Sequence, residues 1–171
     1  TKVDEASSAG ISNVEWDAVE LPSQFMENWC YHKKTLMSFA KHYQTKEVLP
    51  DDLFNKIIKQ KTYHVANGIN RQIYFSMLDL YIHKNKITDI HSIQKKISKK
   101  YLVKDIDEDD KFLCAFEHIF AGGYSAGYCS YKWAEIMSLD AFSAFEEIDM
   151  ENDQEIKKLG LKFRNTILAK G

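Results

Sequence analysis

The stretch TYHVANGINRQIYFSMLDLYIHK, residues 62–84, decides the fold class of this chain. Apolar residues recur in it at intervals of three and four, which is the period of an α-helix with one face on a core. The face that this period predicts consists of Ala66, Ile69, Ile73, Met77, Leu80 and Tyr81. The stretch therefore predicts a long amphipathic helix.

Segments on both sides of this stretch have the same period. Helices are predicted over residues 23–43, after Pro50, near 90–97, near 125–147 and over 153–169. The apolar residues on which these predictions depend include Phe25, Trp29, Leu36, Phe39, Tyr43, Leu53, Phe54, Ile57, Ile58, Ile90, Ile93, Ile97, Ile156, Leu159, Phe163 and Ile167. No segment is typical of a strand. We therefore predict an all-α, irregular multi-helix domain of about six or seven helices.

Three helix starts carry their own signals. Pro50 stands before two aspartates, a pattern that favours a first helical turn. Thr88 or Asp89 can cap the helix near 90, and Asn152 followed by Glu155 resembles a capping box. The chain is predicted to form a single domain over residues 1–171, with a loose loop at residues 1–13.

Composition excludes several functional classes. A net charge of −2 gives no broad field for nucleic acid. No apolar run reaches the roughly 18 residues of a membrane span, and no signal-peptide pattern occurs. Three cysteines without a CxxC pair favour a reducing cytoplasm. The chain starts at Thr1 without Met and stops at Gly171, where a helix would still need its cap, so we expect a piece of a longer polypeptide.

The acidic run DIDEDD, residues 105–110, resembles the start of a calcium-binding loop. Such a loop needs Gly at its sixth position and Glu at its twelfth. Asp110 and Phe116 stand there instead. The run is therefore predicted to be a solvated acidic turn.

A carboxylate in an apolar context makes Glu20 a first candidate for chemistry. It lies in VELPSQF, residues 19–25, with Asp17 three residues before it and Glu27 seven after, so all three could share a helix face. The plain interpretation is that Glu20 is an exposed acid on a helix. The alternative is that a metal ion or a hydrogen-bond donor lies among the three acids, because carboxylates so close together repel one another. Pro22, if inside a helix, would kink it.

Histidine spacing limits what this chain can do with a metal. No two of its six histidines stand three or four residues apart, so HExxH is absent. A catalytic zinc ion takes three protein ligands and an open position. Glu20 would be one ligand in need of two others, and the chain alone is not expected to bind zinc tightly.

The second candidate is HIFAGGYSAGYCSYKW, residues 118–133. Its glycine pair could form a turn before an aromatic core helix, and this is the plain interpretation. The second interpretation is a phosphate-binding loop at a helix N-terminus, but the stretch lacks the Lys-Ser/Thr of the Walker pattern. The third interpretation is a row of phenol donors, with Tyr128 and Tyr131 on one helix face and His118 nearby, directed at a developing oxyanion.

The stretches VELPSQFMENW (19–29) and HIFAGGYSAGYCSYKWAE (118–135) resemble the thimet oligopeptidase family of zinc metallopeptidases, and its oligopeptidase A branch in particular. FAKHY (39–43), RQIYFSMLDLYIH (71–83) and FRNTILAKG (163–171) continue the resemblance in the same order. It implies a mainly helical, zincin-type fold, short peptides as substrates, and zinc as the cofactor of the full-length parent.

The resemblance also implies roles for individual residues. Glu20 matches the third zinc ligand, and Asp17 is a candidate to support it. The catalytic positions match Tyr131, Tyr128 and His118, and the substrate-binding positions match Tyr124, Gly122 and Gly123. Cys129 departs from an aromatic position of many relatives, which puts a minor contact in doubt. The HExxH helix is implied upstream, outside this chain.

Two hypotheses remain. The first is a fragment of a cytoplasmic zinc oligopeptidase, inactive by itself, whose partner is the remainder of the same polypeptide. The second is a non-catalytic helical interaction module with a degenerate peptidase fold. Under the first, apolar surface around Trp16 to Phe25 and Tyr124 to Tyr131 should lie bare or pair with another copy of the chain.

Overall fold

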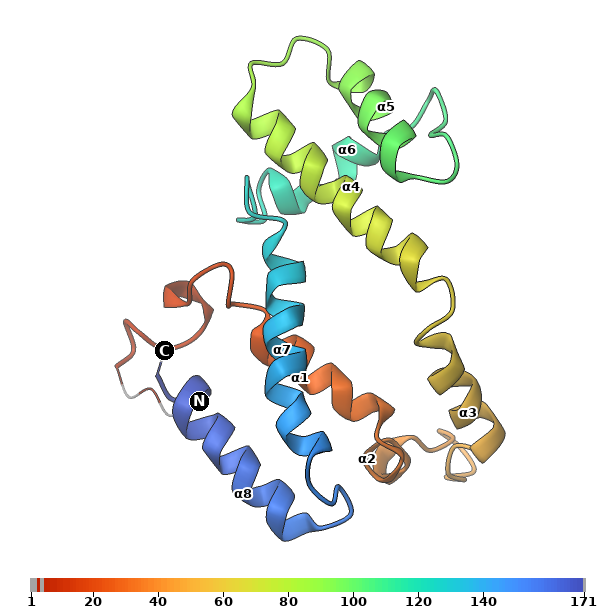
Figure 1. Ribbon diagram of the computed structural model, residues 1–171, viewed down its shortest axis with the longest axis vertical. Helices are drawn as coiled ribbons and strands as arrows, with labels where there is room; N and C mark the ends of the chain where they lie inside the picture. Colours follow the sequence, from red (N-terminus) through yellow and green to blue (C-terminus); the bar gives the residue numbers. More distant parts are fainter. Residues whose placement is uncertain (1–2, 4, 171) are drawn as a thin grey trace. The chain divides into compact units, whose positions relative to one another are not determined.

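The computed structural model describes Val3 and residues 5–170. Residues 1, 2 and 4 of the predicted N-terminal loop, and Gly171, lie outside the described residues. The described residues form eight α-helices (Figure 1), and their only β pairing is an isolated antiparallel bridge between Lys41 and Val48. The all-α prediction is confirmed, with slightly more helices than expected because the predicted first helix is divided and the short α6 was not predicted.

The chain divides into two compact units, which are described separately. Unit 1 comprises residues 1–61 and 133–171, and unit 2 comprises residues 62–132. The elements in chain order are a 3₁₀ turn at Ile11–Asn13, α1 (Leu21–Asn28), a 3₁₀ turn at Trp29–Tyr31, α2 (Lys33–Phe39), α3 (Asp51–Gln60), α4 (Val65–Lys84), α5 (Ile90–Tyr101), α6 (Phe112–Ala115), a 3₁₀ turn at Glu117–Ile119, α7 (Ser130–Glu146), α8 (Asp153–Phe163) and a π turn at Arg164–Leu168.

Local signals in the sequence place several of the helix starts. The Asp89 side chain accepts a hydrogen bond from the Ser92 amide at 3.1 Å and caps α5. Asn152 caps α8 by accepting from the Gln154 amide at 3.1 Å. Pro50 directly precedes α3, whose first turn is acidic as predicted. Short-range hydrogen bonding is enough to set these starts, so they are readable without the tertiary fold.

Unit 2 has a core where α4 and α5 pack against the segment after α6. Its fully or nearly buried members are Tyr74, Phe75, Leu78, Ile97, Leu113, Phe116, Ile119 and Tyr128. Ile90 and Ile93 pack on its edge, so the predicted face of α5 is confirmed. The core joins helices to the loop that precedes α7, which means that the loop is held by tertiary packing.

The predicted core face of α4 is mostly wrong, since of its residues only Tyr81 packs against the core of unit 2. Ile69, Ile73, Met77 and Leu80 are each more than a third exposed, whereas Tyr74, Phe75 and Leu78 on another face are buried. Apolar residues surround most of this helix, so its periodicity does not select one face. Packing of α5 and the later loop makes the choice.

Unit 1 has a core of aromatic rings. Phe25 of α1 lies among Phe142 and Phe145 of α7 and Phe163 of α8, and Trp29 packs on the same cluster. Helix α8 turns back along α7, so its predicted residues Ile156, Leu159 and Phe163 meet this core (Figure 1). The predicted helix over 23–43 is divided instead into α1, a 3₁₀ turn and α2, and its residues Phe39 and Tyr43 are exposed.

Phe25 is expected to be the main stability determinant of unit 1. Its side chain is 3% exposed, and its ring stacks on Phe163 at a centroid distance of 4.1 Å. Phe25→Ala should lower the free energy of unfolding by about 3–5 kcal/mol through lost burial and a residual cavity. Phe39→Ala, at a ring that is 62% exposed, should change it by only about 0.5 kcal/mol. Urea unfolding followed by circular dichroism measures both; equal effects would contradict this packing.

Candidate functional site

The glycine pair forms a tight turn after the 3₁₀ turn at Glu117–Ile119. The amides of Ala121 and Gly122 both donate to the Glu117 carbonyl at 2.9 Å, and the Tyr124 amide donates to the His118 carbonyl at 3.0 Å. Gly123 has a φ of 89°, in the region that favours glycine. A Cβ at Gly122 would lie 2.8 Å from the Cα of His118. Both glycines are therefore required by the backbone itself.

Gly122→Ala should destabilise the chain, because the new methyl group meets main-chain atoms that cannot rotate away. We expect a loss of roughly 1–3 kcal/mol, the range for overpacking. Gly68 offers the matched control, since it lies inside α4 with no atom within 4 Å of an added Cβ. Gly68→Ala should gain about 0.5–1 kcal/mol from helix propensity. The urea midpoints of the two variants should shift in opposite directions, and a stable Gly122→Ala protein would refute the close approach.

The structure brings four predicted site residues into one ring cluster. The His118 ring lies 6.1 Å from the Tyr124 ring, 6.0 Å from that of Tyr128 and 6.1 Å from that of Tyr131, as centroid distances. Tyr124 and Tyr131 stack at 4.7 Å, and Tyr128 and Tyr131 are 5.1 Å apart. His118 is exposed while Tyr124 and Tyr128 are buried. One edge of the cluster therefore faces solvent and the other belongs to the core.

Two expectations about this stretch need correction. Helix α7 begins at Ser130, so Tyr128 lies in the turn before the helix and does not share a helix face with Tyr131. The surface from Tyr124 to Tyr131 is not bare, because the side chains of Tyr124 and Tyr128 are 7% and 8% exposed. The aromatic-core interpretation is thus correct for these rings. It does not exclude the donor interpretation, since a packed ring can still present its hydroxyl group.

Burial raises the pKa of the Tyr128 phenol above its ordinary value of 10.0. The nearby Tyr131 raises this pKa further, and the positive charge of Arg71 opposes the shift. A phenol whose pKa is raised stays protonated, and thus able to donate, throughout the neutral range.

The raised pKa predicts that stability falls in alkali. The unfolded chain loses the Tyr128 proton near pH 10, before the folded chain does, so the stability present below that pH is lost as the pH rises. Tyr128→Phe should flatten this loss, whereas Tyr63→Phe, at a ring that is 72% exposed, should not. Unfolding free energies measured across the alkaline range provide the test, and identical pH profiles for wild type and Tyr128→Phe would contradict it.

A buried carboxylate that the sequence analysis missed holds this loop. Asp79 of α4 is fully buried, and its two oxygens accept hydrogen bonds from the amides of Ala126 at 2.8 Å and Tyr128 at 2.9 Å. An aspartate within an apolar helical stretch was the available signal, because such a group needs donors when it is buried.

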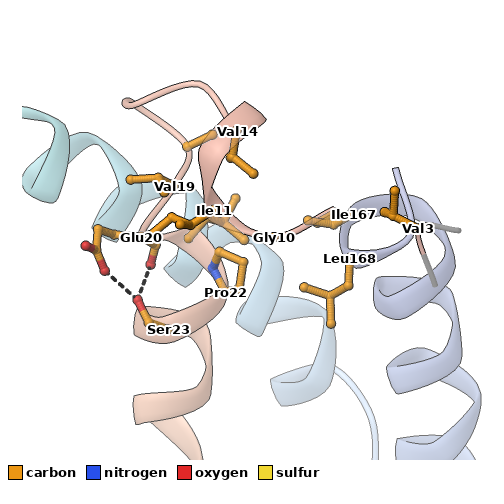
Figure 2. A pocket seen from close by; sticks show the side chains of 12 residues that line it. Val3, Gly10, Ile11, Val14, Val19, Glu20, Pro22, Ser23, Ile167 and Leu168 are labelled. Carbon is orange, nitrogen blue, oxygen red and sulfur yellow. Dashed lines mark hydrogen bonds between the residues drawn. The ribbon is translucent and has the colours of Figure 1, made fainter. Parts of the chain in front are cut away.

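Glu20 lies at the N-terminal end of α1, in unit 1 (Figure 2). The Ser23 hydroxyl lies 2.7 Å from a Glu20 carboxylate oxygen and 2.9 Å from its carbonyl oxygen. A mostly apolar cavity of about 450 Å³ adjoins it, walled by Ile11, Val14, Val19, Leu21, Pro22, Ile167 and Leu168 among others. Of the apolar residues expected around this carboxylate, Val19 and Leu21 line the cavity, whereas Trp16 is 49% exposed.

The predicted geometry around Glu20 is wrong in two respects. Pro22 is the second residue of α1, where a missing amide is tolerated, so it does not kink the helix. Asp17 lies exposed in the turn before α1 and only Glu27 lies within the helix, so the three acids do not share a helix face. Within the described part of the chain, no three His, Cys, Asp or Glu side chains are grouped so as to hold a metal ion.

The profile of Peptidase family M3 matches residues 1–171. The chain belongs to this family. Its resemblance to the oligopeptidase A branch is also confirmed, by the names of its relatives. None of the described helices is long and apolar enough to cross a membrane.

The M3 relatives are similar over the whole of this chain. It is 51% identical to the organellar oligopeptidase A, chloroplastic/mitochondrial, and to the probable cytosolic oligopeptidase A of Arabidopsis thaliana. It is 42% identical to oligopeptidase A of Escherichia coli. In each comparison all of this chain is covered, but only 22% to 25% of the relative. The chain thus spans about a quarter of the length of these M3 proteins.

Proposed function

We propose that this chain forms the part of a zinc oligopeptidase that contacts the scissile carbonyl of short peptides. The observation that carries the proposal is the ring cluster of His118, Tyr124, Tyr128 and Tyr131, set beside a turn that needs both of its glycines. Membership of a peptidase family supports peptide hydrolysis as the reaction.

The proposed roles follow from the chemistry of the side chains. Tyr131 and Tyr128 donate hydrogen bonds to the oxyanion of the tetrahedral intermediate. Phenols suit this role because they keep their proton, and so remain donors, at neutral pH. His118 lies exposed at the edge of the cluster, where a substrate backbone can reach its ring. Tyr124 and the turn at Gly122 and Gly123 line the path of the peptide.

For the metal, the residues present fit one ligand position and no more. Glu20 supplies a carboxylate in apolar surroundings, with Asp17 as a more distant acid on the preceding turn. Zinc, when held with ligands from outside these 171 residues, would polarise a carbonyl group and activate water. The chain by itself is proposed to bind zinc weakly and to lack peptidase activity.

An interaction role is favoured by a separate observation. Trp133, Ile136 and Leu139 of α7 recur at intervals of three and are 56%, 63% and 49% exposed. Of the surface expected to lie bare from Trp16 to Phe25, Trp16 is 49% exposed, but Leu21 and Phe25 are buried. Such exposed residues suit contact with the remainder of a longer polypeptide or with a second copy of this chain. Under the alternative hypothesis this contact, without catalysis, is the whole function.

The experiment that separates the two hypotheses compares residues 1–171 with the full-length product of the gene. We expect the full-length product to cleave quenched fluorescent peptides, a zinc chelator to stop it, and residues 1–171 alone to show no turnover. A full-length product without peptidase activity would favour the interaction module. Turnover by residues 1–171 alone would show that the metal site has been misplaced.

We propose the cytoplasm as the compartment. Cys30, Cys114 and Cys129 are all free and exposed, which suits a reducing environment. One M3 relative is named as cytosolic and another as chloroplastic/mitochondrial. Cell fractionation with an antibody against this chain tests the proposal, and an organellar signal would contradict it.

A further inference from the structure

The carboxylate of Asp79 accepts two backbone hydrogen bonds within unit 2, and the ring of His83 lies beside it. One oxygen accepts from the Ala126 amide at 2.8 Å and the other from the Tyr128 amide at 2.9 Å. The His83 Nδ1 lies 2.9 Å from an Asp79 carboxylate oxygen and 2.9 Å from the Asp79 carbonyl oxygen. Both of these neighbours are acceptors, so Nδ1 carries the proton. The buried carboxylate thus meets donors on two sides.

The donors bridge elements far apart in the chain. Asp79 and His83 stand one turn apart on α4, whereas Ala126 and Tyr128 lie 47 and 49 residues from Asp79. The two amides are two residues apart, and each donates to a different oxygen of the same carboxylate. This pair of hydrogen bonds fixes both the position and the direction of the backbone between them. The Ser125 hydroxyl adds a bond to the Ile119 carbonyl at 2.8 Å.

The backbone at this point is strained. Ala126 has a φ of 56°, in the left-handed region, which costs a non-glycine residue about 1–2 kcal/mol. Such a conformation persists only where the surroundings determine it. Because the Ala126 amide is bonded to a buried charge, the Asp79 carboxylate is the group that stabilises it.

The loop so held begins at the glycine turn and ends at Tyr128. The Tyr128 ring contacts the Tyr131 and His118 rings at centroid distances of 5.1 and 6.0 Å. A shift of the Tyr128 backbone would therefore move the donors of the ring cluster together. Displacement of catalytic groups by about 1 Å can cost ~10²-fold in rate.

We propose that Asp79 is a positioning residue for the ring cluster: its buried carboxylate sets the backbone at Ala126 and Tyr128, and His83 orients the carboxylate. The effect on peptide hydrolysis rests on the function proposed above. The effect on the loop does not, because it follows from the hydrogen bonds alone.

The loop effect is tested by NMR on residues 1–171. In the wild-type chain, hydrogen exchange at the Ala126 and Tyr128 amides should be slower than at Ser125 and Cys129, whose amides have no backbone acceptor among the described residues. Asp79→Asn should speed exchange at both amides by at least about 10-fold, because an amide side chain offers only one acceptor oxygen. Equal exchange at all four amides in the wild type would overturn the proposal even if the variant does not fold.

The control is Asp110→Asn. Asp110 is a second carboxylate of unit 2 that accepts a backbone hydrogen bond, from the Phe112 amide at 2.8 Å, and it also bonds Gln94. The substitution makes the same chemical change outside the loop. Asp110→Asn should leave hydrogen exchange at the Ala126 and Tyr128 amides unaltered. If exchange at these amides is faster in both Asp79→Asn and Asp110→Asn, Asp79 contributes only to general stability.

The catalytic effect is tested in the full-length product. Asp79→Asn should lower kcat by about 10²-fold with little change in KM, whereas Asp110→Asn should keep kcat. Ala126→Gly added to Asp79→Asn should restore part of kcat, because glycine adopts the left-handed conformation without strain. A structural role alone would not give this rescue.

The outcomes separate the two proposals. If Tyr131→Phe lowers kcat but Asp79→Asn does not, the positioning role is wrong and the proposed function stands. If both variants keep wild-type kcat, the function proposed for the cluster fails, and faster exchange in Asp79→Asn would still establish the hold on the loop.

Discussion

Tyr131→Phe in the full-length product should lower kcat by roughly 10²–10³-fold, the usual result of removing one oxyanion donor. The substitution keeps the ring, which stacks on Tyr124 at 4.7 Å and lies 5.1 Å from Tyr128, so packing of the cluster is preserved. The hydroxyl bond strengthens only as negative charge develops on the substrate. KM should therefore move little, because the ground-state carbonyl gains less from the donor.

Steady-state kinetics on a short quenched peptide measure this effect. Tyr128→Phe should be milder if that residue mainly positions substrate. Tyr101→Phe is the matched control, since Tyr101 is another partly buried tyrosine packed on the unit 2 core. A Tyr131→Phe enzyme with wild-type kcat would return the residue to a purely structural role.

Glu20→Gln should remove most of the zinc from the full-length product and most of its turnover. In the proposed metal site the carboxylate would supply negative charge to the zinc ion, and an amide would not. We expect the zinc affinity to fall by more than the roughly 10–100-fold typical of groups that only support a ligand. The fold should persist, because a glutamine oxygen can still accept from the Ser23 hydroxyl, now 2.7 Å from the Glu20 carboxylate.

Metal analysis after dialysis, together with calorimetry, gives the occupancy. Glu27→Gln is the control, since Glu27 is an exposed acid near the C-terminal end of α1. Glu27→Gln should keep its zinc. Full occupancy and normal turnover in Glu20→Gln would remove this residue from the metal site.

Features encoded by neighbouring residues were readable from the sequence. The caps at Asp89 and Asn152 depend on side chains two or three residues from the amides they bind. The glycine turn was visible for the same reason, because its strain is local. The aromatic composition of residues 118–131 likewise indicated that these rings would gather.

Features decided by tertiary contacts were not readable. The buried face of α4 depends on where α5 and the later loop pack, and the apolar residues of α4 fit more than one answer. The two backbone amides that donate to Asp79 lie 47 and 49 residues away in the sequence, so no local pattern predicts them. Pro22 lies in the first turn of α1, where a proline is tolerated, so the kink considered from the sequence does not form.

Tyr131 is proposed to bind the oxyanion of a peptide bond under attack. A phosphinic peptide, whose tetrahedral phosphorus carries two oxygens, imitates that state and binds without reacting. Its inhibition constant should rise in Tyr131→Phe by the same ~10²–10³-fold factor by which kcat/KM falls, while KM for the matching substrate stays nearly constant. An inhibition constant unchanged from wild type would contradict the claim.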